Sequence, residues 1–125
     1  YYLYGAGHPE RYRTADVVEL LERADVFVAQ CGDEPGGFVA VETDDFACVV
    51  RCICVSPGFE ARGVAHQLLD WVEGLAIDRG LGRLIARVPA VDGPSLHLYG
   101  GHGFDRRPEN DEMLVLEKRL PMAAG

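Results

Sequence analysis

The chain has 125 residues, of which 48% are hydrophobic and 26% charged, enough for one globular domain but not for two. Its formal net charge of −8 argues against a nucleic-acid partner, which requires clustered cations, and favours a cationic substrate such as an amine. No apolar run approaches the ~20 residues that span a bilayer, and no basic-then-apolar segment opens the chain, so we expect a cytoplasmic protein without membrane contacts. Because the chain begins at Tyr1 and not at Met, we expect its N-terminal part to be incomplete.

The cysteines predict no metal site. The sequence contains Cys31, Cys48, Cys52 and Cys54, none of which forms a Cys-x-x-Cys pair, and no histidine pair has the spacing of zinc ligands. The last three have the same parity on a predicted strand, so we expect their side chains on one face. Buried thiols behave as small hydrophobes, and reduced cysteines fit a cytoplasmic location.

The first half of the chain predicts a short helix followed by antiparallel strands. Residues 1–13 are aromatic and irregular, and no element is predicted there. The expected elements are a helix over 15–24 capped by Thr14, a strand over 26–30, a loop over 32–37, a hairpin strand over 38–43 and a turn at Asp44 and Asp45. Residues 47–55 are rich in β-branched residues and cysteine, which predicts a central strand buried on both faces.

The second half predicts a strand–helix–strand unit. Apolar residues at helical spacing predict a helix over 62–79, which ends at Gly80. A strand over 83–88 follows, and a connection of this length implies that it lies parallel to the strand at 47–55. A short helix over 95–100 and two antiparallel strands over 104–106 and 113–117 complete the domain.

The turn between the strand at 47–55 and the following helix has the properties of a phosphate site. The first backbone N–H groups of a helix lack partners within the helix, and the macrodipole makes that end partly positive. Gly63 allows close approach of a phosphate to the backbone, and Arg62 adds a positive charge. On these residues alone, a solvent-exposed turn is the simpler interpretation.

The surrounding sequence resembles the cofactor-binding motif of the GNAT superfamily of acyl-CoA-dependent N-acyltransferases. The family pattern is Gln/Arg-x-x-Gly-x-Gly/Ala after a strand that ends in Val-x-Pro. Here the strand ends in Val55-Ser56-Pro57, and the loop is Glu60-Ala61-Arg62-Gly63-Val64-Ala65. The glycine and alanine positions match, whereas Glu60 stands where the family usually has Gln or Arg. A carboxylate at this position would repel phosphate unless it points into solvent.

A second segment resembles the same superfamily. Family members often carry Asn-x-x-Ala-x-x-Leu-Tyr followed by Gly-Phe, and this chain has Asp92-Gly-Pro-Ser95-Leu-His-Leu98-Tyr99 followed by Gly103-Phe104. Asp replaces the Asn and Ser replaces the Ala. The two motifs and the order of strands and helices together cover residues 26–119. The resemblance implies an α/β (α+β) fold with a mixed, mostly antiparallel twisted sheet and a central, splayed pair of parallel strands.

The resemblance also implies a mechanism and a set of site residues. The backbone of Cys54 and Val55 would bind the pantetheine arm of acetyl-CoA as if it were another strand. The residues Arg62, Gly63, Val64 and Ala65 would hold the pyrophosphate. A primary amine would attack the thioester directly in a ternary complex. Tyr99 would donate a proton or hydrogen bond to the leaving thiolate, whereas from the residues alone a core tyrosine is an equally good interpretation.

No general base is predicted for the reaction. The central strand carries no carboxylate within 46–55, and Glu42, Asp44 and Asp45 are better explained as solvated turn residues. His97 and His102 are expected to be ordinary surface histidines. The acceptor and the acyl chain length carry no sequence signal, and apolar faces on the last two strands leave a homodimer open.

Other classes of enzyme fit the sequence less well. Ser56 and Ser95 lie outside a Gly-x-Ser-x-Gly motif, and a nucleophilic Cys54 has no base nearby in the sequence. A dinucleotide-binding domain would need a Gly-x-Gly-x-x-Gly after a strand. The open alternative is a non-catalytic CoA-binding regulatory or interaction module of the same fold.

Overall fold

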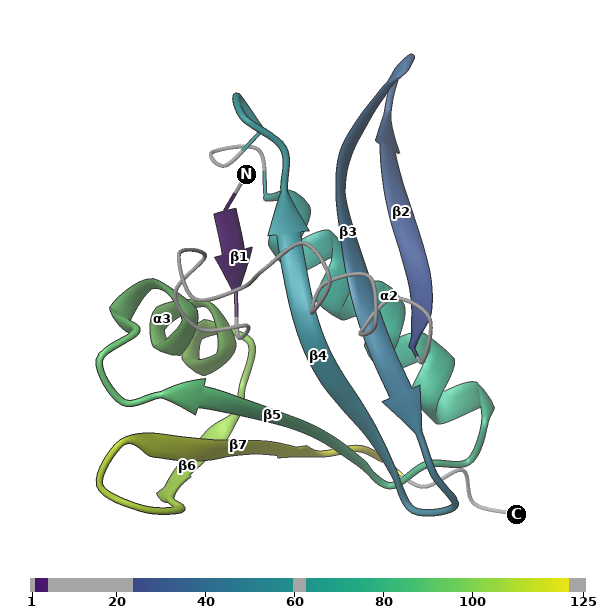
Figure 1. Ribbon diagram of the computed structural model, residues 1–125. Helices are drawn as coiled ribbons and strands as arrows, with labels where there is room; N and C mark the ends of the chain where they lie inside the picture. Colours follow the sequence, from purple (N-terminus) through teal and green to yellow (C-terminus); the bar gives the residue numbers. More distant parts are fainter. Residues whose placement is uncertain (1, 5–23, 60–62, 122–125) are drawn as a thin grey trace.

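The protein folds around one mixed, strongly twisted sheet (Figure 1). The computed structural model describes residues 2–4, 24–59 and 63–121. The strands are β1 (Tyr2–Tyr4), β2 (Asp25–Cys31), β3 (Glu34–Thr43), β4 (Ala47–Val55), β5 (Arg83–Pro89), β6 (Asp105–Pro108) and β7 (Met113–Arg119), and the helices are α2 (Val64–Asp78) and α3 (Gly93–Gly101). The strand order is β2-β3-β4-β5-β7-β6, with β1 paired to β4 outside this path.

The pairing directions confirm the predicted fold class. β4 and β5 are parallel, joined through α2, while the other pairs of strands are antiparallel. The predicted strands over 26–30, 47–55, 83–88 and 113–117 and both predicted helices of the second half are present, with bounds within a few residues. The predicted helix over 15–24 lies almost wholly outside the described residues. Among the described helices, none has the length and apolarity needed to cross a bilayer.

The main core lies between the sheet and α2, which runs behind β3 and β4 in Figure 1. The apolar stripe of α2 is buried as its spacing predicts, with Leu69 and Val72 fully inaccessible. Leu98, Tyr99 and Phe104 extend this core beside β5. The helix ends at Gly80, which has φ 73°, a conformation that glycine adopts without steric cost.

A β-bulge in β4 corrects the prediction that three cysteines share one face. Ala40 of β3 pairs with Cys52, whereas Val41 pairs with Val50, so Arg51 is the extra residue. The bulge reverses the alternation of side chains along the strand. Cys48 therefore packs in the main core, whereas Cys52 packs with Ala40 in a second, smaller cluster.

Two expectations about the N-terminal half were wrong. Residues 2–4 form β1, although no element was predicted there. The loop predicted over 32–37 is a tight turn, because β3 already begins at Glu34. Gly37 permits this longer strand, since a Cβ atom at its position would lie 2.4 Å from the Cys54 carbonyl oxygen. The sequence pattern shows the glycine but not the close approach of β4 that requires it.

Candidate functional site

The parallel strands β4 and β5 separate halfway along their length. They pair only from Ala47 to Val50 on β4 and from Arg83 to Ala86 on β5, although both strands continue beyond this point. Figure 1 shows the two strands diverging, with β4 rising and β5 running toward α3. The predicted splayed pair is therefore present, and the edge of β4 that faces β5 loses its partner after the bulge.

Part of this edge is paired with β1. β3 occupies one edge of β4 from Cys48 to Val55, so every other partner of these residues lies on the opposite edge. On that opposite edge Tyr2 pairs with Val55, Leu3 with Cys54 and Tyr4 with Ile53. The stretch of β4 at Cys54 and Val55, predicted to bind a pantetheine arm, thus has a paired strand on each edge in this structure.

The turn after β4 is anchored to β3. The Ser56 backbone N–H donates to the Gly36 carbonyl at 2.8 Å, and the Ser56 hydroxyl donates to the Pro35 carbonyl at 2.9 Å. Gly58 has φ 87°, and the Phe59 N–H donates back to the Ser56 carbonyl at 3.0 Å. These contacts explain Ser56 as a turn residue. They also fix the position from which the chain returns to α2.

Within the described residues, no side chain caps the N-terminus of α2. Its N-cap residue is Gly63, which has φ 72° and, being a glycine, supplies no side chain to cap the helix. The first turn contains no acidic residue, so nothing there offsets the positive end of the macrodipole. Among the described residues, no atom lies within 4 Å of a Cβ placed on Gly63. Glu60, Ala61 and Arg62 lie outside the described residues, and the role predicted for Arg62 stays a prediction.

The second motif forms a capped helix. The Asp92 side chain caps α3 by accepting hydrogen bonds from the Ser95 N–H at 3.1 Å and the Ser95 hydroxyl at 2.7 Å. Ser95 is completely buried in this role, which makes it a poor nucleophile. Asp and Ser in place of the family's Asn and Ala therefore form a standard helix cap and keep the helix start in place.

Tyr99 is positioned by the last turn of α3. Its carbonyl accepts from the N–H groups of His102 and Phe104 at 3.1 Å each, and its ring contacts that of Phe104 edge-on at a centroid distance of 5.1 Å. The side chain is fully buried, yet its hydroxyl has no hydrogen-bond partner among the described residues. Leaving a buried hydroxyl unpaired costs about 1–3 kcal/mol, so the site favours a ligand that pairs with it.

The electrostatic surroundings keep Tyr99 protonated. Burial raises the pKa of its phenol well above the usual range, with smaller contributions from Cys52 and Asp92. Tyr99 packs in the main core together with Ile53 and Val55, the part of β4 where the pairing with β5 has ended. A neutral phenol in this position can donate a hydrogen bond but cannot act as a base.

The buried cysteines are not poised as nucleophiles. Burial raises the pKa of both Cys48 and Cys52 to about 11, and it also raises the pKa of Cys54. A nucleophilic thiol requires a depressed pKa and a nearby base. The described part of the chain thus supports the interpretation of these residues as small hydrophobes.

The carboxylates considered as bases have other partners. Asp44 accepts hydrogen bonds from the N–H groups of Phe46 and Ala47 at 2.6 and 2.8 Å, and these bonds lower the pKa of its carboxyl. Glu42 lies 3.8 Å from the Arg51 guanidinium in an exposed ion pair. The structure therefore brings neither of these carboxylates into contact with Tyr99.

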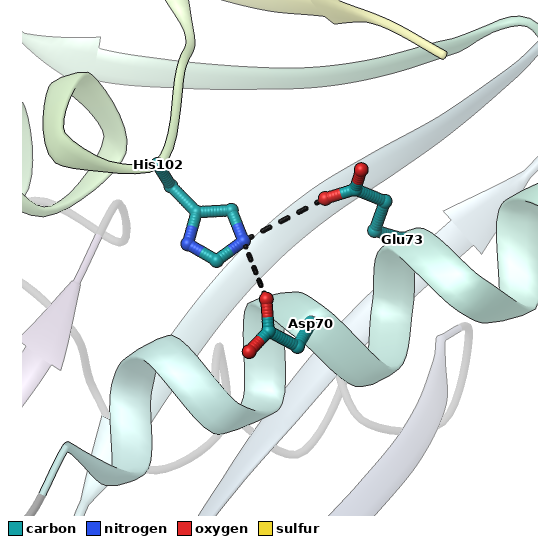
Figure 2. Close-up of side chains that lie close together, drawn as sticks. All are labelled: Asp70, Glu73 and His102. Carbon is teal, nitrogen blue, oxygen red and sulfur yellow. Dashed lines mark ion pairs between the residues drawn. The ribbon is translucent and has the colours of Figure 1, made fainter. Parts of the chain in front are cut away.

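A polar cluster that the sequence did not predict lies between α2, the end of α3 and β7 (Figure 2). His102 Nε2 lies 3.1 Å from Asp70 Oδ1 and 3.7 Å from Glu73 Oε2, and Lys118 Nζ lies 2.9 Å from the same Glu73 oxygen. On its other side the His102 ring stacks on His66, with 3.3 Å between the Nδ1 atoms. The His102 side chain is only 10% exposed, so its prediction as a surface residue was wrong.

The cluster is better explained as a structural network than as a metal centre. The ligand atoms of Asp70, Glu73 and His102 lie within 4.8 Å of one another, close enough for a cation. However, the Lys118 ammonium already neutralises Glu73, and the Asp70 side chain is 73% exposed. Asp70 and Glu73 are three residues apart on α2 and could have been paired from sequence, but His102 and Lys118 come from distant elements.

Comparison with known proteins agrees with this architecture. Residues 1–104 match the model of the acetyltransferase (GNAT) family, and the chain belongs to this family. No curated protein matches the chain.

Solved structures of the same fold include the ribosomal-protein-S18-alanine N-acetyltransferase of Escherichia coli, with TM-score 0.77 and 19% identity over 95% of this chain and 84% of that one. A GNAT family acetyltransferase of Elizabethkingia anophelis with acetyl-CoA bound gives TM-score 0.74 and 20% identity over 95% and 96%. An acetyltransferase of Bacillus subtilis in complex with CoA gives TM-score 0.73 and 21% identity over 86% and 84%.

The polar cluster predicts a pH-dependent contribution of His102 to stability. Burial, Lys118 and His66 lower the pKa of His102, against the opposing effect of Asp70 and Glu73. Because the folded state disfavours the protonated ring, this contribution is present above the unfolded pKa of about 6.5 and is lost as the pH falls through the lower folded pKa. Between pH 8 and pH 5, wild type should lose more stability than His102→Gln in urea unfolding. Equal losses of unfolding free energy in the two proteins would contradict a contribution of His102 to the pH dependence.

Proposed function

We propose that this protein is an acyl-CoA-dependent N-acyltransferase, which transfers an acetyl group from acetyl-CoA to a primary amine by direct attack. The observation that carries the proposal is the Tyr99 hydroxyl, which is buried in the same core cluster as Ile53 and Val55 of β4 and has no hydrogen-bond partner in the described part of the chain. Family membership and the bound acetyl-CoA of the Elizabethkingia neighbour support the choice of donor.

The chain offers two backbone sites to the donor. The N-terminal amides of α2 at Gly63, Val64 and Ala65, together with Arg62, would bind the pyrophosphate at the positive end of the helix. The backbone of Cys54 and Val55 would bind the pantetheine arm in the manner of an added strand. Both sites lie at the end of β4, joined by the turn that Ser56 anchors to β3.

Tyr99 would act on the leaving group. Its neutral phenol would donate to the thiolate sulfur as the thioester carbon–sulfur bond breaks, and the hydroxyl would gain the partner that it lacks. The chain would further contribute by holding the thioester and the amine together, which replaces an encounter in solution with a reaction between oriented groups.

An amine is the proposed acceptor. The net charge of −8 favours a cationic molecule in the vicinity of the protein, and the Escherichia coli neighbour is named for the N-acetylation of an alanine. An acceptor that arrives protonated must lose a proton before it attacks. Since Glu42 and Asp44 are engaged elsewhere, we propose that water carries this proton away.

The same engagement of the carboxylates favours a second candidate function, a CoA-binding regulatory or interaction module without catalysis. One experiment distinguishes the two functions. An enzyme releases CoA thiol from acetyl-CoA faster when amines such as polyamines, amino sugars and basic peptides are supplied. A binding module is stabilised thermally by CoA but acylates none of these amines.

Replacing Gly63 by aspartate should weaken CoA binding about ten-fold relative to Gly63→Asn, because a carboxylate beside the α2 amides repels the pyrophosphate. Both residues tolerate a positive φ, and the space around Gly63 accommodates either. Isothermal titration with CoA gives the two dissociation constants, and thermal melts verify the fold. Aspartate is favourable at a helix N-terminus, so reduced affinity without reduced stability is expected. Equal CoA affinities of the two variants would show that the pyrophosphate does not bind at the N-terminus of α2.

Replacing Tyr99 by phenylalanine should lower kcat about 100-fold, a typical contribution of a positioned proton donor. The dissociation constant for CoA should change little, and thermal stability should be equal or higher because an unpaired buried hydroxyl is removed. Steady-state kinetics with the best amine of the panel measures the effect. An unchanged kcat would return Tyr99 to a packing role.

A further inference from the structure

Beyond Val50, β5 leaves one edge of β4. This edge is the proposed site of the pantetheine arm, and it is also the edge with which β1 pairs. β3 pairs with β4 from Cys48 to Val55, and β5 takes the opposite edge only as far as Val50. β1 takes that opposite edge at Ile53, Cys54 and Val55. In Figure 1, β1 lies beside the upper half of β4, between β4 and α3. The N-terminal strand thus occupies the stretch of backbone that the proposed function assigns to the pantetheine arm.

β1 and the pantetheine arm cannot pair with the same edge of β4 at the same time. Each residue presents its N–H and C=O groups to one side of the strand or the other, and each edge accepts one partner. On the edge that β1 occupies, the N–H and C=O groups come from Ile53 and Val55, and an arm bound there as an added strand requires them to be free of β1. Binding of one partner therefore excludes the other, whatever their relative affinities.

β1 is short enough to detach from β4 and be replaced by the pantetheine arm. The strand has only three residues, and among the described elements it pairs with β4 alone. Strands this short contribute few ladder hydrogen bonds, so β1 can leave without loss of the pairing between β3 and β4. The central sheet does not depend on it, because β5 is joined to β4 directly through Ala47 to Val50.

We propose that β1 is an internal competitor of the acyl donor: the donor binds only after β1 has left the Ile53–Val55 edge of β4. This inference rests on the proposed function. Its quantitative consequence is that the apparent dissociation constant for CoA exceeds the intrinsic one by the inverse of the fraction of molecules in which β1 is detached. Any interaction that draws the N-terminal strand away would raise donor affinity by the same factor.

The register of the two strands provides a direct test. Residue 3 lies opposite Cys54, a free cysteine. Directly opposed residues in antiparallel strands have Cα atoms about 4.5–5.5 Å apart, within the range for a disulfide. In the full chain carrying Leu3→Cys, oxidation with oxidised glutathione should bind β1 covalently to β4. CoA affinity should fall at least about ten-fold and return on reduction with dithiothreitol.

Two further variants complete the experiment. Leu3→Ser cannot form the bond, so its CoA affinity should be insensitive to oxidation. Tyr4 lies opposite Ile53, whose N–H and C=O groups point toward β1, so Tyr4→Pro removes a ladder donor. It should bind CoA more tightly than wild type, by about ten-fold if β1 is attached in nine molecules of ten. Isothermal titration measures all constants, and mass spectrometry of peptides verifies the disulfide.

The outcomes separate the two proposals. Unchanged affinity of the disulfide-linked protein, or a Tyr4→Pro variant that binds no tighter than wild type, would overturn the competition while leaving the proposed function intact. If neither wild type nor Tyr4→Pro nor reduced Leu3→Cys binds CoA, the proposed function itself fails, and the competition fails with it.

Discussion

The organisation of this protein depends on which strands pair with the two edges of β4. β3 pairs along one edge almost from end to end, while the other edge changes partner at the bulge around Arg51. Before the bulge the partner is β5, and beyond it β5 has turned away. A strand buried on both faces but unsupported by its parallel neighbour presents backbone groups that must be paired by something else. That requirement connects the fold to its proposed chemistry.

The remaining features of the site are arranged around this opening. The turn anchored by Ser56 brings α2 back so that its uncapped N-terminus lies at the end of β4. α3 contributes Tyr99, whose hydroxyl is buried in the core shared with β4 and has no partner among the residues that the structure describes. The polar cluster of Asp70, Glu73 and His102 joins α2 to the end of α3, and thereby stabilises the relative positions of the two helices that flank the opening.

Much of this could be predicted from the sequence, because the informative signals are local. The spacing of apolar residues in α2, the turn after Val55 and the Asp92 cap each depend on neighbours within a few residues. The bulge at Arg51 could not be predicted, since it depends on the register between β3 and β4. The pairing of β1 is also a long-range contact, and it involves an aromatic segment without alternation. His102 was misplaced for the same reason, because its partners come from α2 and β7.

The proposed chemistry requires the donor to lie along the Cys54–Val55 edge with its pyrophosphate on the N-terminus of α2. A crystal structure of the protein grown with CoA would show whether it does. We expect density for the pyrophosphate against the amides of Gly63 to Ala65, the pantetheine arm in the position of β1, and the sulfur within hydrogen-bond distance of the Tyr99 hydroxyl. Density for CoA elsewhere, with β1 still paired to β4, would contradict it.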